Sequence, residues 1–197
     1  MLSMRWWRWA ARMAGFLILG SIAVPSPLGA ADEAPTPKPG TEATVETAIG
    51  SFVIHLRPDL APDQVKYFLK TARSGGYDGT TFHRIVPGQV IQGGDPYSKD
   101  PAREAEYGRG GFGIVKAEVT KKGFTRGVVV AARCPTNRDS AGTQFFVVLA
   151  DQPTLRGLYT IFGEVTSGLE VADAIGDQGG DDGKPRRRVE MRVHVLE

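Results

Sequence analysis

Alternating hydrophobic and polar positions dominate the chain from about residue 44 onward and predict a succession of short strands. In residues 44–56 the side chains of Phe52, Ile54 and Leu56 fall on one face, which predicts two strands about a turn at Gly50-Ser51. Residues 80–86 and 89–92 predict two more strands joined through Pro87-Gly88. Further strands are expected in the apolar or alternating runs 127–132, 143–150, 159–165 and 189–196.

Two segments instead repeat apolar residues at helical spacing. The first helix is expected to begin near Pro62 and to end at Gly75-Gly76, with one apolar side formed by Val65, Phe68, Leu69 and Ala72. A shorter helix is expected at about residues 168–175. Residues 95–113 are polar and interrupted by prolines and glycines, so they predict a long loop of the kind that often carries function.

About eight strands with few helical crossovers favour a closed antiparallel sheet, because closure removes the unpaired strand edges. We therefore predict a mainly β fold, a closed eight-stranded antiparallel β-barrel capped by two α-helices. The length of 197 residues suits one such domain with a short appendage.

Residues 1–30 have the pattern of a secretory signal peptide. Three arginines precede an apolar run at residues 13–24, which is too short to span a bilayer comfortably, and small residues follow it. Cleavage is expected after Ala30 or after Ala31. The alternative is an uncleaved amphipathic anchor with Trp6, Trp7 and Trp9 at the membrane interface.

The remaining sequence divides into a linker and one domain. Residues 31–43 are rich in Pro, Thr, Ala and Glu without hydrophobic periodicity, which predicts a flexible linker. The folded domain is then expected to span residues 44–197. Export would leave it periplasmic or extracellular, with no stable membrane association after signal cleavage.

Charge and cysteine content narrow the function classes. Removing residues 1–30 takes away three arginines and no acidic residue, so the formal net charge falls from +2 to −1. Such a balance gives no electrostatic reason to expect nucleic-acid binding, and Arg186, Arg187 and Arg188 are interpreted as solvated residues beside the last strand. Cys134 is the only cysteine, which excludes an intramolecular disulfide, and the scattered histidines give no metal-ligand spacing.

Three motifs carry the chemical information. Residues 77–95 read YDGTTFHRIVPGQVIQGGD, residues 139–147 read DSAGTQFFV, and residues 155–165 read LRGLYTIFGEV. The first resembles the cyclophilin signature, and the other two match cyclophilin segments in the same order. This resemblance covers most of the chain after the linker and implies the same eight-stranded barrel that the strand pattern predicts.

The resemblance implies catalysis of rotation about X-Pro peptide bonds in proline-containing polypeptides, by an expected monomer. This reaction needs no metal or cofactor, because its barrier falls when the site binds the twisted amide better than the planar one. The catalytic residues would be Arg84, Gln92 and Phe146, of which Arg84 would donate a hydrogen bond toward the prolyl nitrogen. The implied substrate-binding residues are His83, Gln89, Val90, Ala132, Arg133, Gln144, Leu155 and Tyr159.

Three positions depart from the family pattern. Gln89 and Thr154 stand where many cyclophilins have aromatic residues, and Tyr159 replaces a common His. These changes make the implied proline pocket more polar, and they predict poor binding of the inhibitor cyclosporin. Two hypotheses therefore remain: an isomerase that assists the folding of exported proteins, and a cyclophilin-like binding module or chaperone with weak or no catalysis.

Overall fold

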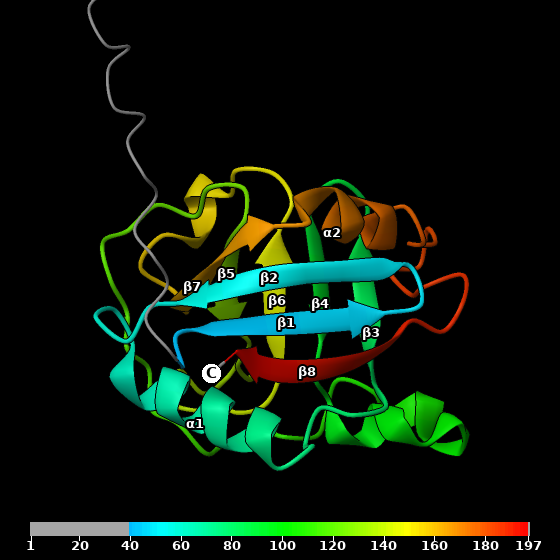
Figure 1. Ribbon diagram of the computed structural model, residues 1–197, viewed down its shortest axis with the longest axis horizontal. Helices are drawn as coiled ribbons and strands as arrows, with labels where there is room; N and C mark the ends of the chain where they lie inside the picture. Colours follow the sequence, from blue (N-terminus) through cyan, green and yellow to red (C-terminus); the bar gives the residue numbers. More distant parts are fainter. Residues whose placement is uncertain (1–39, 197) are drawn as a thin grey trace, which may run out of the picture. The chain divides into compact units, whose positions relative to one another are not determined.

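The computed structural model describes residues 40–196, so the predicted signal peptide and residues 31–39 of the predicted linker lie outside the described residues. Within this range the strands close into an antiparallel barrel in the order β1-β2-β7-β5-β6-β4-β3-β8 (Figure 1). The predicted fold class is confirmed. The strands are β1 (Glu42–Thr47), β2 (Gly50–Leu56), β3 (Thr80–Val86), β4 (Val90–Gly93), β5 (Val128–Ala131), β6 (Phe145–Val148), β7 (Thr160–Ser167) and β8 (Glu190–Leu196).

Two α-helices pack on the barrel, α1 (Pro62–Arg73) and α2 (Leu169–Gly176), and they lie on either side of the strands in Figure 1. Helix α1 contacts β7 and β8, whereas α2 contacts β2 and β4. Three 3-10 helices complete the described part of the chain, η1 (Pro96–Lys99), η2 (Pro101–Glu106) and η3 (Pro153–Leu155). None of the helices in residues 40–196 is long and apolar enough to cross a membrane.

Aromatic side chains fill the barrel beneath α1. The ring of Phe68, on the buried side of this helix, lies 5.1 Å from Tyr77, 5.9 Å from Phe145 and 5.3 Å from Phe162 between ring centroids. All four side chains are fully buried. Burial of each such ring stabilises the fold by about 1.5–3 kcal/mol, so this packing fixes α1 against the end of the barrel.

A second apolar cluster covers the outer face of β5 and β6. Val129 and Ala131 point into the interior cluster, whereas Val128 and Val130 belong to the outer one, so β5 is buried on both faces. The fully buried strand β6 follows the same rule. These strands therefore read as continuous apolar runs in the sequence instead of alternating ones.

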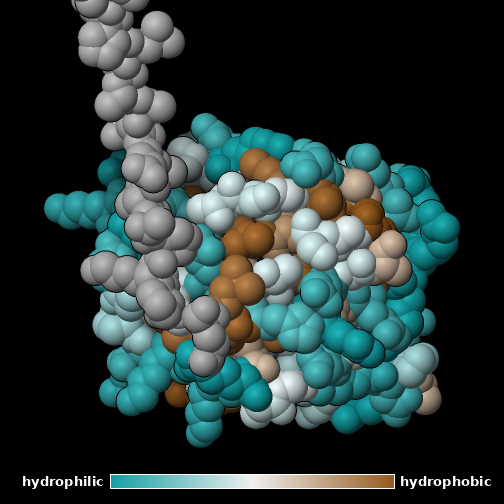
Figure 2. Space-filling model, in the orientation of Figure 1, coloured by the Kyte–Doolittle hydropathy of each residue, from teal (hydrophilic) through white to brown (hydrophobic). Residues whose placement is uncertain are grey.

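The opposite side of the barrel is formed by β2, β1 and β8, and this side carries both hydrophobic and hydrophilic residues. Figure 2 shows this face with hydrophobic patches bordered by hydrophilic residues. Because β6 is four places from β1 in the closed strand order, the outer apolar cluster lies on the far side of the barrel.

Several predicted boundaries differ from the structure. The first hairpin turns at residues 48–49, not at Gly50-Ser51, and β1 begins at Glu42, two residues before the expected start. Strand β4 begins at Val90 instead of Gln89. The expected loop at residues 95–113 contains η1 and η2, so it is partly ordered as helical turns.

Candidate functional site

Three of the predicted residues lie in one row across adjacent strands. Arg84 of β3 is the register partner of Gln92 of β4, and Gln92 is the register partner of Phe146 of β6. Register partners in a sheet place their side chains on the same face. The row therefore brings a guanidinium, an amide and an aromatic ring side by side on the outside of the barrel.

A cavity of about 1070 Å³ opens over Arg84 and Gln92 in this row. Its lining includes His83, Arg84 and Gln92 from β3 and β4, together with Arg133 and Tyr159. Consecutive strand residues normally face opposite sides, but the β3–β4 register shifts between Phe82 and Arg84. Such a bulge re-aims a side chain, which accounts for His83 and Arg84 lining the same cavity.

The Arg84 guanidinium is exposed in this cavity. Among residues 40–196 it forms no hydrogen bond and no ion pair. Its N–H donors are fixed in a planar fork. They are therefore available to a molecule that enters the cavity.

Gln92 is held by an amide network that reaches into the protein. Its Nε2 donates to Oε1 of Gln144 over 2.9 Å, and Nε2 of Gln144 donates to the carbonyl oxygen of Gly110 over 2.8 Å. Gln144 is fully buried, so its orientation is fixed by these bonds. The Gln92 carbonyl oxygen and its second N–H then remain for a bound molecule.

Phe146 forms the apolar part of the site. Its ring is 6% exposed and meets Tyr159 edge to face, with centroids 5.6 Å apart and an interplanar angle of 89°. Arg133 lies over the Tyr159 ring with its guanidinium carbon 4.7 Å from the centroid. The other predicted apolar positions belong to the same outer cluster, namely Val90, Ala132 and Leu155.

His83 lines the cavity but is almost fully buried. Both ring nitrogens lack a hydrogen-bond partner among the described residues, and the ring meets Tyr107 edge to face. Burial lowers the pKa of His83 below its ordinary value, because the charged imidazolium loses its hydration. The imidazole is therefore neutral near pH 7.

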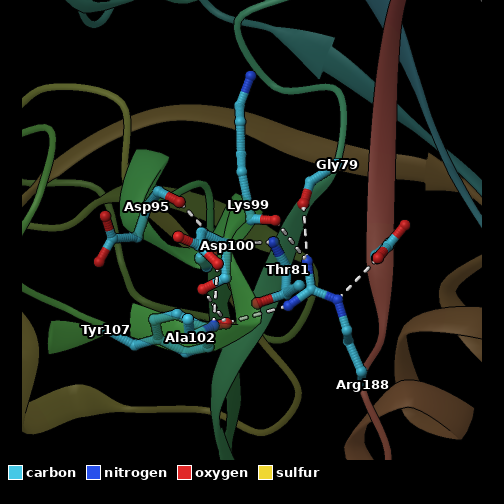
Figure 3. A network of polar contacts seen from close by, with 10 residues as sticks. Gly79, Thr81, Asp95, Lys99, Asp100, Ala102, Tyr107 and Arg188 are labelled. Carbon is cyan, nitrogen blue, oxygen red and sulfur yellow. Dashed lines mark hydrogen bonds and ion pairs between the residues drawn. The ribbon is translucent and has the colours of Figure 1, made fainter. Parts of the chain in front are cut away.

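The segment carrying η1 and η2 forms one wall of the cavity and is held to the barrel by polar contacts (Figure 3). The fully buried Asp95 carboxylate accepts from the backbone N–H groups of Tyr97 and Gly108. Arg188 donates to the carbonyl oxygens of Gly79 and Lys99, to the Tyr107 hydroxyl and to Glu190. These bonds fix the wall relative to β3 and β8.

A glycine at the end of β4 permits this arrangement. Gly94 has a φ of 81°, and a Cβ atom there would lie 2.6 Å from the carbonyl oxygen of Thr143. A larger residue would therefore strain the backbone that carries Asp95.

The predicted site residues thus fall into three groups. His83, Arg84, Gln92, Arg133 and Tyr159 line the cavity itself. Phe146, Val90, Ala132 and Leu155 form the adjoining apolar cluster, and Gln144 supports Gln92 from within. Gln89 lies exposed in the β3–β4 turn and is not among the cavity-lining residues, so its predicted binding role stays a prediction.

Several lining residues were not predicted as part of the site. Tyr107, Arg109 and Phe112 come from the segment that was expected to be a functional loop, so its length and composition were the signal for them. Arg186, Arg187 and Arg188 were interpreted as solvated residues beside a strand. All three are exposed and lie just before β8, and they also line the cavity, which no local pattern indicates because the nearest motif residue lies more than twenty positions away.

Known proteins resemble this chain in sequence and in fold. Residues 43–195 match the model of the family described as cyclophilin type peptidyl-prolyl cis-trans isomerase/CLD. A probable peptidyl-prolyl cis-trans isomerase of Brucella suis is 37% identical over 153 residues, which cover 75% of this chain and 78% of that protein. Peptidyl-prolyl cis-trans isomerase B of Bacillus subtilis is 42% identical over 118 residues, which cover 59% of this chain and 77% of that protein.

A solved structure shows the same fold. The crystal structure of a cyclophilin type peptidyl-prolyl cis-trans isomerase from Cryptosporidium parvum, determined in the presence of the dipeptide Ala-Pro, has a TM-score of 0.70 and 27% identity. The match covers 79% of this chain and 98% of that one. With the family model, the relatives and the barrel in agreement, the chain belongs to the cyclophilin-type peptidyl-prolyl cis-trans isomerase family.

Proposed function

We propose that this chain accelerates rotation about X-Pro peptide bonds with Arg84 as the principal catalytic residue. One observation carries the proposal: an exposed guanidinium without a partner in the described residues stands in register with Gln92 and Phe146. A cationic donor, an amide and an apolar surface are thus presented together to one bound segment.

The reaction requires relief of amide resonance. Planar X-Pro bonds cross a barrier of about 18–20 kcal/mol, and the nitrogen lone pair becomes localised as the bond twists. A hydrogen bond from Arg84 to that nitrogen is stronger in the twisted state than in the planar one, so it lowers the barrier. Gln92, oriented by Gln144, holds the backbone of the substrate during the twist.

Phe146 and Tyr159 supply the surface for the proline ring. Their edge-to-face pair forms a firm apolar floor beside the cavity, bordered by Val90 and Leu155. The Cryptosporidium relative was crystallised in the presence of Ala-Pro, which supports proline-containing peptides as the ligands of this site.

A binding module with little catalysis is the second candidate function. Thr154 is exposed on η3, and Gln89 is exposed in the β3–β4 turn, so neither encloses the proline surface as an aromatic residue could. A less enclosed site binds substrate more weakly. Under this alternative the protein binds proline-containing peptides without Arg84-dependent turnover.

A protease-coupled cis/trans assay distinguishes the two functions. Arg84→Ala should reduce turnover by about tenfold or more, because it removes a transition-state donor and no buried volume. Arg192→Ala, an equal loss of charge outside the cavity on β8, is the control and should leave turnover unchanged. Unchanged turnover in a folded Arg84→Ala protein would show that Arg84 is not catalytic.

The cellular role belongs to the same proposal. The leader-like residues 1–30 support export, and a monomeric isomerase outside the cytoplasm would act on proline-limited folding of other exported proteins. The slow uncatalysed isomerisation of X-Pro bonds, tens to hundreds of seconds, gives such an enzyme a physical purpose there.

A further inference from the structure

The cavity concentrates positive charge. Its lining includes seven Lys or Arg side chains and only two acidic ones, Glu104 and Asp182. The full chain has a net charge of only +2, so this surplus is local. Catalysis by one arginine does not require it.

Three of these cationic side chains already form hydrogen bonds or ion pairs with other groups of the protein. Arg188 is bound by Glu190, Tyr107 and two carbonyl oxygens, and Lys184 forms an ion pair with Glu104 at 3.1 Å. Arg133 donates to the carbonyl oxygens of residues 134, 135 and 158. These side chains shape the wall and are poorly placed to gain a new partner.

Three others retain most of their hydrogen-bonding capacity. Arg186 donates one bond to the carbonyl oxygen of Asp177, and Arg187 donates one bond to Oε1 of Gln178. Arg109 makes no side-chain hydrogen bond within residues 40–196, and Glu106, whose pKa it helps to lower, is held by Arg103. None of these three exposed guanidiniums forms an ion pair there, although each has five N–H donors.

The strand order places Arg186 and Arg187 near the expected path of a bound polypeptide. The proline surface at Phe146 lies on β6, Arg84 lies two strands away on β3, and residues 182–188 precede β8, which neighbours β3. A polypeptide with its proline at Phe146 that continues across Arg84 therefore reaches Arg186 and Arg187.

We propose that Arg109, Arg186 and Arg187 select substrates that carry Asp or Glu within three residues of the proline. This inference rests on the proposed isomerase function and names its substrate class. Guanidinium forks match carboxylates in geometry and charge, so each bound carboxylate gains charge-assisted hydrogen bonds.

A nucleic acid is the less suitable occupant. Binding to its backbone requires a row of cations that follows several phosphates. Here Arg109, Arg186 and Arg187 line one bounded cavity, which can take a short acidic side chain more readily than several successive phosphates.

NMR exchange spectroscopy on proline-containing hexapeptides tests the proposal. Glu and Gln are compared at each of the three positions before and after the proline, with the full chain as catalyst. Because an exposed ion pair contributes about 0.2–1 kcal/mol, two pairs near the middle of that range, about 0.7–1.4 kcal/mol together, should make catalysed exchange about threefold to tenfold faster for Glu than for Gln at one position or more. The advantage should shrink at about 1 M salt, where charges are screened within about 3 Å.

The double variant R186Q/R187Q should lower that Glu-to-Gln ratio to about twofold or less. The matched control R138Q/R192Q removes two exposed charges outside the cavity and should keep the wild-type ratio. A ratio near one at every position in wild type, a ratio that survives R186Q/R187Q, or competition by a single-stranded oligonucleotide at about 0.15 M salt would overturn the proposal. Absence of turnover on every peptide would instead refute the isomerase function itself.

Discussion

Neighbouring residues of the site contribute to different properties. Arg84 is exposed and removes no core volume when truncated, whereas Phe146 is buried in the outer apolar cluster. We expect Phe146→Ala to lower the free energy of unfolding by about 3–5 kcal/mol as well as to reduce turnover. Urea denaturation of both variants measures this, and equal unfolding midpoints for Arg84→Ala and Phe146→Ala would contradict it.

His83 makes stability depend on pH. Its pKa in the folded protein lies below the ordinary value of 6.5, so the unfolded chain takes up a proton that the folded protein refuses. Stability should therefore fall as pH drops below about 6.5, by at most about 1.4 kcal/mol per pH unit, until the folded pKa is reached.

Unfolding free energies at pH 7.5 and 5.5 test this for wild type and His83→Gln, which cannot titrate. The variant should show the smaller pH dependence, because the substitution removes only the His83 contribution. An NMR titration of the wild-type His83 ring gives a second measure, and an apparent pKa at or above 6.5 would refute the expectation.

Motif residues and wall residues differed in how far they could be predicted. Arg84, Gln92 and Phe146 could be proposed as site residues because they stand inside recognisable motifs, although their common row became visible only with the strand register. Arg186 and Arg187 could not, because their relation to Arg84 depends on barrel closure between β3 and β8, about a hundred positions apart. Composition near a residue carries no information on such contacts.

Element boundaries were missed where side chains act on the backbone. In the first hairpin Thr47 Oγ1 accepts from the N–H of Ile49 and donates to the carbonyl oxygen of Gly50, which closes the turn before the glycine. In the wall segment Asp95 and Asp100 cap η1 and η2 through the N–H groups of Tyr97 and Ala102. Each aspartate precedes a proline at the first helical position, a start signal that the sequence contained.

Helix α1 depends on a cap from a distant segment. Its N-cap position, Ala61, offers no side-chain acceptor, and the Glu118 carboxylate instead accepts from the N–H groups of Asp63 and Gln64 at 3.0 and 2.9 Å. Glu118→Ala should therefore lower the free energy of unfolding by about 1–2 kcal/mol. Glu170→Ala, an exposed acidic residue in the first turn of α2, is the control and should cost less than about 0.5 kcal/mol.

Chemical denaturation of the two glutamate variants makes the comparison. Equal losses would mean that Glu118 acts only through its charge near a helix terminus and not through its two hydrogen bonds. A preserved stability in Glu118→Ala would show that water replaces the carboxylate without cost.

At the scale of the whole molecule, the barrel could be predicted from the sequence. Alternating side chains indicate the strands, and strands with unpaired edges favour closure of the sheet. The distribution of charge over the surface could not be predicted from the sequence. A near-neutral total concealed a cavity with seven cationic side chains, because net charge averages over surfaces that the fold separates. The sequence therefore predicted the fold class, but its composition did not indicate the substrate class that we propose.

Cleavage of the predicted signal peptide would remove every tryptophan from the exported protein. All three Trp, at positions 6, 7 and 9, lie in the segment interpreted as a signal peptide, whereas the five Tyr lie beyond it. If a signal peptidase cuts after Ala30 or Ala31, the exported protein begins at Ala31 or Asp32 and shows only tyrosine-type fluorescence. Intact mass and emission spectra of protein from the exported fraction of the native host measure both properties. Indole emission from a membrane-associated protein whose mass retains residues 1–30 would establish the uncleaved anchor instead. The test is independent of catalysis, because a binding-only protein with the same leader would be cleaved in the same way.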